Sequence, residues 1–263
     1  MSDVSLIIPC YNHATALERA VVSGLAQDGL CEIVVVDDCS TDNSLCVAKQ
    51  LAERDPRIHV VRMDRNSGPG AARNLGVRCA HGSYVSFLDA DDELIEPDFF
   101  MAALNAMATQ PGMVVIKSDM EFFDPVKGYL LPAFDPRYQS AVLSSSCAML
   151  IARDAFFLVG GFPELDVFRG SLGGEDVAFM QAVMEHLQPL GRLPSVCYRV
   201  WSQSGSHIDK FLASTRLTAT GFEFVDQSPE RVAMASEAEK AVSRYVDGVR
   251  QRVRQETEVS NDE

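Results

Sequence analysis

Three carboxylates stand together in the segment Asp89-Ala90-Asp91-Asp92, directly after the apolar run 84–88. Carboxylates this close repel one another unless a cation or a basic group lies among them. Hard oxygen ligands suit Mg²⁺ or Mn²⁺, which proteins commonly share with phosphate oxygens. Acidic turn residues and a helix N-cap are the alternative, and capping suffices for Asp92. We favour a metal or nucleotide site at Asp89 and Asp91, because capping does not explain why acids gather at a strand end.

A second acidic pair, Asp37 and Asp38, follows the apolar run 32–36. A carboxylate at this position can accept hydrogen bonds from the base or the ribose of a nucleotide. The next polar residues, 40–42, are of the types that cap helices. Capping therefore explains those three residues and leaves one of the two aspartates to be explained.

The loop 66–76 carries Gly68, Gly70 and Arg73. It does not match the dinucleotide-binding pattern G-x-G-x-x-G, because Arg73 stands at the third glycine and the loop follows the third strand rather than the first. An arginine one turn into a helix would help to hold an anionic ligand. The alternative is a plain connecting loop with a surface arginine.

Glu175 and Asp176 begin a predicted helix after a glycine pair. They are suited to a general base placed by a mobile loop, and equally to favourable contacts with the helix dipole. The sequence leaves both interpretations open. His207 lies in the polar stretch 202–209, where a surface histidine is more typical than a metal ligand.

The elements that must position these residues alternate between strand and helix in the first half of the chain. Short apolar runs predict strands at residues 4–8, 32–36, 58–62, 84–88 and 113–117. Amphipathic stretches between them predict helices, so the expected fold is α/β, a mostly parallel sheet with helices on both faces. Such sheets bind ligands at the carboxyl ends of their strands. The polar residues at those ends are Asn12, Asp37, Asp38, Asp89, Asp91 and Asp92.

The second half is less regular. Residues 119–139 predict loop or short strands, whereas 153–159 and 175–186 predict helices. Apolar residues at steps of three or four predict a long amphipathic helix over 230–256, whose other face is basic. A solvated surface is the favoured interpretation of that face, and contact with a membrane surface or a partner is the weaker alternative.

Composition limits the class of function. The 263 residues are 47% hydrophobic and 23% charged, values typical of a globular chain. The net charge of −14 argues against a nucleic-acid partner and suits divalent cations. The seven cysteines form no C-x-x-C pair, which predicts reduced thiols in a cytoplasmic protein. We expect no signal peptide and no membrane span, because no apolar run is long enough.

Together these segments resemble the family 2 glycosyltransferases, which have the GT-A fold. The matching segments follow the family's order over roughly residues 4–200 and are 5–12, 34–42, 68–74, 87–92, 160–162 and 174–176. The resemblance implies a GT-A-like three-layer domain with a C-terminal helical extension. Residues 1–118 would form its nucleotide-sugar-binding half, residues 119–205 its acceptor-binding and catalytic half, and residues 206–263 the helical extension and tail.

The same resemblance implies transfer of a sugar, with inversion, from a nucleotide diphosphate-sugar donor. A UDP-sugar is favoured as donor, and a saccharide or a lipid-linked molecule as acceptor. Asp176 would be the base with Glu175 beside it, and Asp91 would bind Mn²⁺ or Mg²⁺. The other implied donor-site residues are Pro9, Tyr11, Asn12, Asp37, Asp38, Gly70, Arg73, Asp89 and Ala90. The basic last helix would permit peripheral contact with the inner face of a membrane.

Departures from the family pattern leave the acceptor side and one metal ligand open. Members often have a histidine soon after a Tyr-Arg pair, whereas here Tyr198-Arg199 leads to Trp201 and the next histidine is His207. Two alternatives therefore stay in view. One is a haloacid dehalogenase-type phosphatase, whose Asp-x-Asp signature follows a strand. The other is a non-catalytic nucleotide-sugar-binding protein.

Overall fold

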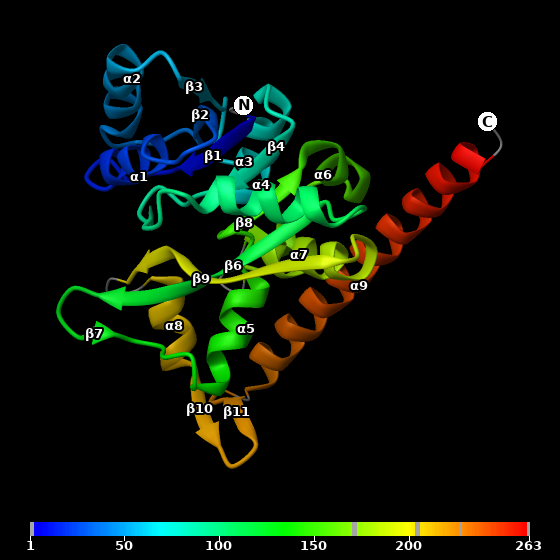
Figure 1. The fold of residues 1–263 in the computed structure, drawn as a ribbon. Coiled ribbons are helices and arrows are strands. Elements are labelled where there is room, and N and C mark those ends of the chain that lie inside the picture. Colours follow the sequence, from blue (N-terminus) through cyan, green and yellow to red (C-terminus); the bar gives the residue numbers. More distant parts are fainter. Residues whose placement is uncertain (1–2, 170–172, 203–205, 227, 262–263) are drawn as a thin grey trace.

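A mixed β-sheet forms the centre of the computed structural model, which describes residues 3–169, 173–202, 206–226 and 228–261 (Figure 1). The side chains of Arg169, His207 and residues 257–261 lie outside that description. The strands are β1 (Val4–Cys10), β2 (Leu30–Asp37), β3 (Ile58–Arg62), β4 (Tyr84–Phe87), β5 (Glu93–Leu94), β6 (Val115–Asp124), β7 (Gly128–Tyr129), β8 (Met149–Ala152) and β9 (Leu190–Trp201). Their order is β3-β2-β1-β4-β8-β6-β9-β5, and β7 pairs with β6.

Helices connect and flank these strands. They are α1 (Leu17–Leu25), α2 (Ser44–Arg54), α3 (Pro69–Cys79), α4 (Phe99–Thr109), α5 (Pro136–Ser144), α6 (Arg153–Val159), α7 (Glu175–His186), α8 (His207–Ala213) and α9 (Pro229–Asn261). A 3₁₀ turn, η1, spans Asp166–Arg169, and a separate hairpin joins β10 (Thr215–Thr218) to β11 (Gly221–Phe224). The bottom of Figure 1 shows this hairpin below α5 and α8.

The first four strands are parallel and follow the sequence prediction. Every residue of β1 is buried, as a strand covered on both faces requires. The chain runs outward from β1 through β2 to β3 and then crosses back to β4. Because such crossovers are right-handed, α1 and α2 lie on one face of the sheet and α3 on the other.

The second half departs from the prediction in two places. Residues 119–139 were expected to be loop or short strands, yet β6 continues to Asp124 and α5 begins at Pro136. β6 alternates buried and half-buried residues near its end and pairs in parallel with β9, which the sequence did not indicate. Long-range pairing with β9 stabilises this extended segment, and local propensity does not report such pairing.

The last helix is longer than its predicted range. α9 packs against α6 and α7 through buried Ala241, Val246 and Val249 and then runs on past them toward the C-terminus (Figure 1). In the described ranges, no helix combines the length and the apolar character that crossing a bilayer requires. All seven cysteines are free thiols, and three of them, Cys10, Cys147 and Cys197, are buried.

Candidate active site

The carboxyl ends of β1, β2 and β4 bring the predicted donor-site residues to one edge of the sheet. Between β1 and β4 the strand order reverses, and open parallel sheets bind ligands at such switch points. Asn12 follows β1, Asp38 follows β2 and Asp89 follows β4. The expected gathering of polar side chains at this edge is therefore present.

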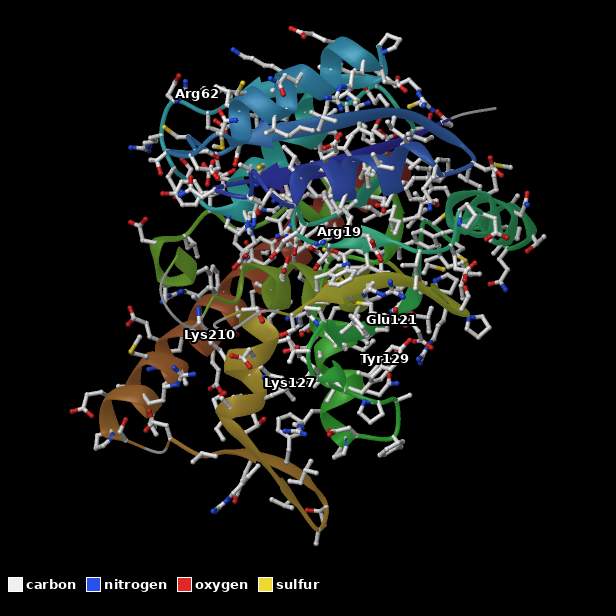
Figure 2. The ribbon with its side chains drawn as sticks, turned by 90° about the vertical axis from the view of Figure 1, so that its left-hand side faces the viewer. Arg19, Arg62, Glu121, Lys127, Tyr129 and Lys210 are labelled. Carbon is white, nitrogen blue, oxygen red and sulfur yellow. The ribbon has the colours of Figure 1, made fainter. Side chains whose placement is uncertain are left out.

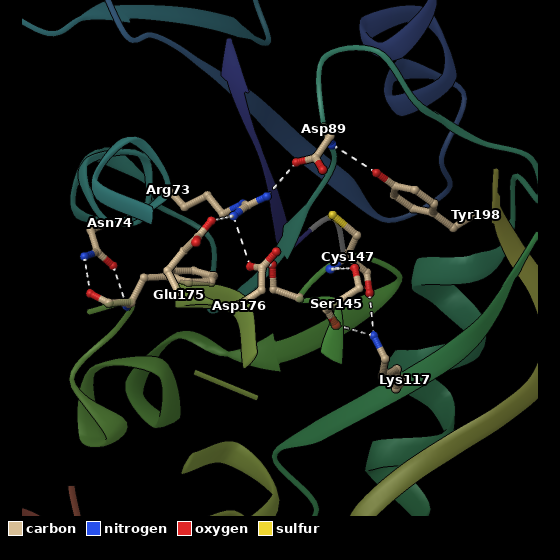
Figure 3. A network of polar contacts seen from close by, with 11 residues as sticks. Arg73, Asn74, Asp89, Lys117, Ser145, Cys147, Glu175, Asp176 and Tyr198 are labelled. Carbon is tan, nitrogen blue, oxygen red and sulfur yellow. Dashed lines mark hydrogen bonds and ion pairs between the residues drawn. The ribbon is translucent and has the colours of Figure 1, made fainter. Parts of the chain in front are cut away.

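Arg73 lies at the centre of this edge and joins residues that are far apart in the sequence (Figure 3). Its guanidinium donates to Asp89 Oδ1 at 2.6 Å and to Asp176 Oδ1 at 3.1 Å. Glu175 Oε1 lies 3.9 Å from Arg73 Nη1. Burial opposes the charge of the guanidinium, but Asp176 and Asp89 raise the pKa of Arg73, so the group stays charged. Arg73 thus holds carboxylates together that would otherwise repel one another.

The alternative of a plain surface arginine is wrong, because the Arg73 side chain is only 2% exposed. The sequence predicted that Arg73 lies near an anionic ligand, whereas in the structure its guanidinium contacts Asp89, Asp176 and Glu175 of the same chain. Its guanidinium also lies 5.3 Å from the centre of the Phe162 ring.

α3 approaches α7 closely because Gly70 has no side chain. A Cβ at Gly70 would come within 3.2 Å of both Glu175 Cγ and Phe162 Cβ. Asn74, one turn further along α3, accepts from the Phe162 N–H at 2.8 Å and donates to its carbonyl at 2.9 Å. These contacts fix the distance between the helix that carries Arg73 and the start of α7.

Glu175 and Asp176 form the first turn of α7. Burial raises the pKa of Glu175 to about 7, and the neighbouring Asp176 adds to this shift, whereas Arg73 opposes it. The Asp176 side chain is 28% exposed, so it can be reached from solvent. Phe179, at the next turn, stacks on Phe162 with ring centres 4.2 Å apart. This packing holds the two acids in place.

The segment that follows β4 is tied to β9 through Asp92. Tyr198 donates from its hydroxyl to Asp92 Oδ2 at 2.8 Å, and the Trp201 N–H donates to Oδ1 at 2.8 Å. The Asp89 N–H donates in turn to the Tyr198 hydroxyl at 3.1 Å. Asp92 is therefore a buried anchor and not the N-cap that the sequence suggested, since Asp98 precedes α4.

Asp91 fits a cation site better than any other described residue of this segment. Burial and the charge of Asp89 raise its pKa, and the opposing contributions of His13, Arg19 and its own backbone N–H do not cancel this shift. Among the other described residues, none forms a hydrogen bond or ion pair with its side chain, while its carbonyl accepts from Arg19. A half-buried carboxylate with free lone pairs beside a second carboxylate is suited to a hard divalent cation.

A complete protein-built metal site is not present among the described side chains, where no three metal-ligating groups come together. The side chain of His207, which the sequence left as the less favoured metal-ligand candidate, lies outside the described residues. The prediction that Asp91 and Asp89 bind a cation therefore stays a prediction.

The aspartates after β2 are buried and differ in their contacts. Asp38 accepts from the Ser67 N–H at 2.7 Å and from the Gly68 N–H at 2.8 Å, so it joins the loop between β2 and α2 to the start of α3. Asp37 accepts from the Ser40 N–H at 3.3 Å and lies 3.5 Å from the Arg62 guanidinium. Their part in nucleotide binding stays a prediction.

The residues at the end of β1 have unequal roles in the fold. Asn12 adopts a positive φ of 60° and accepts from the Thr41 N–H at 2.8 Å, so it orders the β2–α2 loop. Pro9 lies within β1, and Tyr11 is 42% exposed. Ala90, between the two aspartates, is buried. No contact of these residues tests the donor-binding roles expected of them.

Arg19 of α1 closes one side of the site. Its guanidinium lies 4.5 Å from the centre of the Trp201 ring, a cation–π contact, and it donates to the Asp91 carbonyl. Figure 2 shows Arg19 between the upper half, which carries Arg62, and the lower half, which carries Tyr129. The sequence did not single out Arg19, because a lone arginine on an amphipathic helix is ordinary.

Three further residues of the site were missed from the sequence: Tyr198, Ser146 and Lys117. Ser146 donates to Asp176 Oδ1 at 2.7 Å. Lys117 is 3% exposed and donates to the backbone carbonyls on both sides of Ser146. A lysine within an otherwise apolar strand was the available signal for Lys117, whereas no local pattern marks Ser146.

Comparison with known proteins assigns the family. Residues 5–162 match the model of glycosyl transferase family 2. The chain is 43% identical over 97 residues to the succinoglycan biosynthesis protein ExoO of Rhizobium meliloti, covering 36% of this chain and 27% of that protein. It is 45% identical over 91 residues to the putative teichuronic acid biosynthesis glycosyltransferase TuaG of Bacillus subtilis, covering 34% and 36%. The chain thus aligns with about a third of the length of these relatives.

Solved structures share the fold. Residues 1–349 of TarS from S. aureus, in complex with UDP, align with a TM-score of 0.63 at 22% identity, covering 76% of this chain and 61% of that chain. The mannosyltransferase PcManGT of Pyrobaculum calidifontis, in complex with GDP-Man and Mn²⁺, aligns with a TM-score of 0.62 at 23% identity, covering 81% and 61%. The expected GT-A-like α/β fold is confirmed, and the family match removes the phosphatase alternative. The chain belongs to glycosyl transferase family 2.

Proposed function

We propose that this chain is a metal-dependent glycosyltransferase that moves a sugar, with inversion, from a nucleotide diphosphate-sugar to an acceptor hydroxyl. One observation carries the proposal: Arg73 contacts both Asp89, beside the expected donor diphosphate, and Asp176, the expected base. One buried side chain thus joins the donor and acceptor sides of the site.

The donor would lie across the carboxyl ends of β1, β2 and β4. Asp37 and Asp38 would meet the base, with Pro9, Tyr11 and Asn12 at the end of β1 beside it. Asp89, whose side chain is 39% exposed, would face the ribose. A UDP-sugar is the favoured donor; TarS has been crystallised with UDP and with UDP-GlcNAc, whereas PcManGT was solved with GDP-Man.

Mn²⁺ or Mg²⁺, when bound at Asp91, would neutralise the negative charge that develops on the diphosphate leaving group. The described residues supply few protein ligands, so the donor's phosphate oxygens would complete the coordination. The cation and the donor would then bind together.

Asp176 would accept the proton of the acceptor hydroxyl. As that oxygen bonds to the anomeric carbon, the bond from this carbon to the diphosphate oxygen breaks, and its electron pair leaves with the nucleotide. A positioned base of this kind contributes on the order of 10²- to 10⁴-fold in rate. Glu175, with its pKa near 7, would lie beside the acceptor.

The acceptor would be a saccharide or a lipid-linked molecule, bound by the half of the chain that follows β6. Peripheral contact of the basic face of α9 with the inner leaflet of a membrane would suit a lipid-linked acceptor. Binding of the protein to anionic vesicles at low salt tests that contact, and its absence there would remove it from the proposal.

The release of free nucleotide tests the proposed reaction. The protein is incubated with a panel of UDP-, GDP-, dTDP- and CDP-sugars, with and without Mn²⁺. We expect metal-dependent release from one donor class that is lost in Asp176→Asn. Asp154→Asn is the matched control, because Asp154 occupies the first turn of α6 but is exposed. Nucleotide binding without any turnover would favour the non-catalytic alternative.

A further inference from the structure

The two oxygens of Asp176 have different surroundings. Oδ1 accepts from Ser146 Oγ at 2.7 Å and from Arg73 Nη1 at 3.1 Å. Among the described residues, no hydrogen bond reaches Oδ2. Because Oδ1 already accepts two hydrogen bonds, Oδ2 is the oxygen with lone pairs left for a proton.

Ser146 is fully buried and lies in the turn between α5 and β8. Lys117 Nζ donates to the carbonyl of Ser145 at 2.7 Å and to that of Cys147 at 2.7 Å (Figure 3). The ammonium group of Lys117 therefore binds the backbone on both sides of Ser146. The Ser145 hydroxyl adds a contact within the turn, since it accepts from the Cys147 N–H at 3.1 Å.

The backbone just after this turn is in an unusual conformation. Ala148 has a φ of 55°, a value that costs a residue with a Cβ about 1–2 kcal/mol. Its carbonyl accepts from the Ser118 N–H at 2.8 Å, so the residue after Lys117 also holds this segment. A strained backbone persists when its surroundings over-determine it, and such strain is typical of functional sites.

A buried lysine is a costly way to hold a turn. Burial lowers the pKa of Lys117 to about 8, so the fold opposes its charge. The charged or titratable groups around it are Cys147, Asp176, Asp119 of its own strand and Arg192, its register partner on β9. An apolar side chain of similar length would avoid the desolvation cost but would leave two buried carbonyls without a donor.

We propose that Ser146 is a positioning residue for Asp176, that Lys117 fixes the turn carrying it, and that Oδ2 of Asp176 receives the acceptor's proton. The inference rests on the proposed function, since it concerns the same base. Ser146 directs Oδ1 away from the acceptor by hydrogen bonding it. Lys117 acts indirectly, because it hydrogen-bonds the backbone on both sides of Ser146 and so fixes the position of Ser146.

The test compares Ser146→Ala with Ser118→Ala. Ser118 is a matched control because it is also buried, lies next to Lys117, and donates to the Asp119 carbonyl instead of to Asp176. Loss of one hydrogen bond to a charged group corresponds to about 10- to 100-fold in rate. We expect Ser146→Ala to lower kcat by that factor while the donor KM changes less than about twofold. Ser118→Ala should keep the wild-type kcat.

A double-mutant cycle separates positioning from a merely structural effect. In an Asp176→Asn background, the further change Ser146→Ala should lower the residual rate by less than about twofold, because Ser146 acts through Asp176. Lys117→Met should lower kcat in the wild type and add little to Ser146→Ala. If Lys117→Met does not fold, the Ser146 cycle alone decides.

The outcomes distinguish this inference from the proposed function. Full activity of Ser146→Ala, or an equal loss in both Asp176 backgrounds, overturns the positioning role while the transferase stands. Nucleotide binding by a wild-type protein that releases no nucleotide from any sugar donor overturns both.

Discussion

Arg73 donates to Asp176 at 3.1 Å across 103 positions of sequence. Through this contact the helix that follows β3 reaches the first turn of α7. The same guanidinium binds Asp89, so the position of the base depends on the segment that follows β4. A substitution at Asp89 should therefore alter the position of Asp176, and a substitution at Asp176 should alter that of Asp89.

Asp176→Asn should separate binding from chemistry. The amide keeps the size of the side chain and can still accept from Ser146, but it does not take up a proton. We expect nucleotide affinity, measured by calorimetry, to stay near the wild-type value while turnover falls by about 10²- to 10⁴-fold. Equal losses in affinity and turnover would contradict the assignment of Asp176 as base.

Asp91→Asn should abolish metal-dependent donor binding without weakening the fold. Burial and Asp89 raise the pKa of Asp91, so its ionised form destabilises the folded protein at neutral pH. We expect the melting temperature of the protein without ligands to be unchanged or higher. Asp98→Asn, an exposed aspartate before α4, is the control and should bind donor and metal normally. A large drop in melting temperature would show that Asp91 is structural.

Arg73→Met should destabilise the protein in a pH-dependent way. Removing one partner of a buried ion pair costs about 3–5 kcal/mol, because the remaining charges lose their compensation. The loss should be smaller at pH 5.5 than at pH 8, since Glu175, with its pKa near 7, is protonated at the lower pH. Chemical denaturation at both pH values measures this. Arg78→Met, on the exposed last turn of α3, should change stability little at either pH.

Glu175→Gln should stabilise the folded protein at high pH. The pKa of Glu175 is raised from 4.5 to about 7, so the folded state binds a proton that the unfolded state has lost between these values. Wild-type stability therefore falls as pH rises through this window, and the penalty is complete above about pH 7. We expect a gain on the order of 1–3 kcal/mol at pH 8 and almost none at pH 4.5. An unchanged stability difference across this range would contradict the raised pKa.

Local sequence determined the first half of the fold and the candidate acids. β1 to β4 are short apolar runs separated by amphipathic helices, and a polar residue follows β1, β2 and β4 within two positions. Parallel strands need a crossover, so their carboxyl ends meet at one edge. From this rule alone, Asn12, Asp38 and Asp89 could be placed together. The pattern at Glu175 and Asp176 named the two acids but left capping and catalysis equally open.

Only the tertiary structure decided what these acids contact. Three contacts join residues that are far apart in the sequence. They are the contacts of buried Arg73 with the acids, the hydrogen bond from Tyr198 to Asp92, and the hydrogen bond from Ser146 to Asp176. The length of β6 depends in the same way on pairing with β9. Such contacts leave no periodic signal, because they arise from the packing of whole elements and not from the propensity of neighbouring residues. The sequence by itself therefore determined which groups could do the chemistry, and the packing of α3, α7 and β9 decided how they are held.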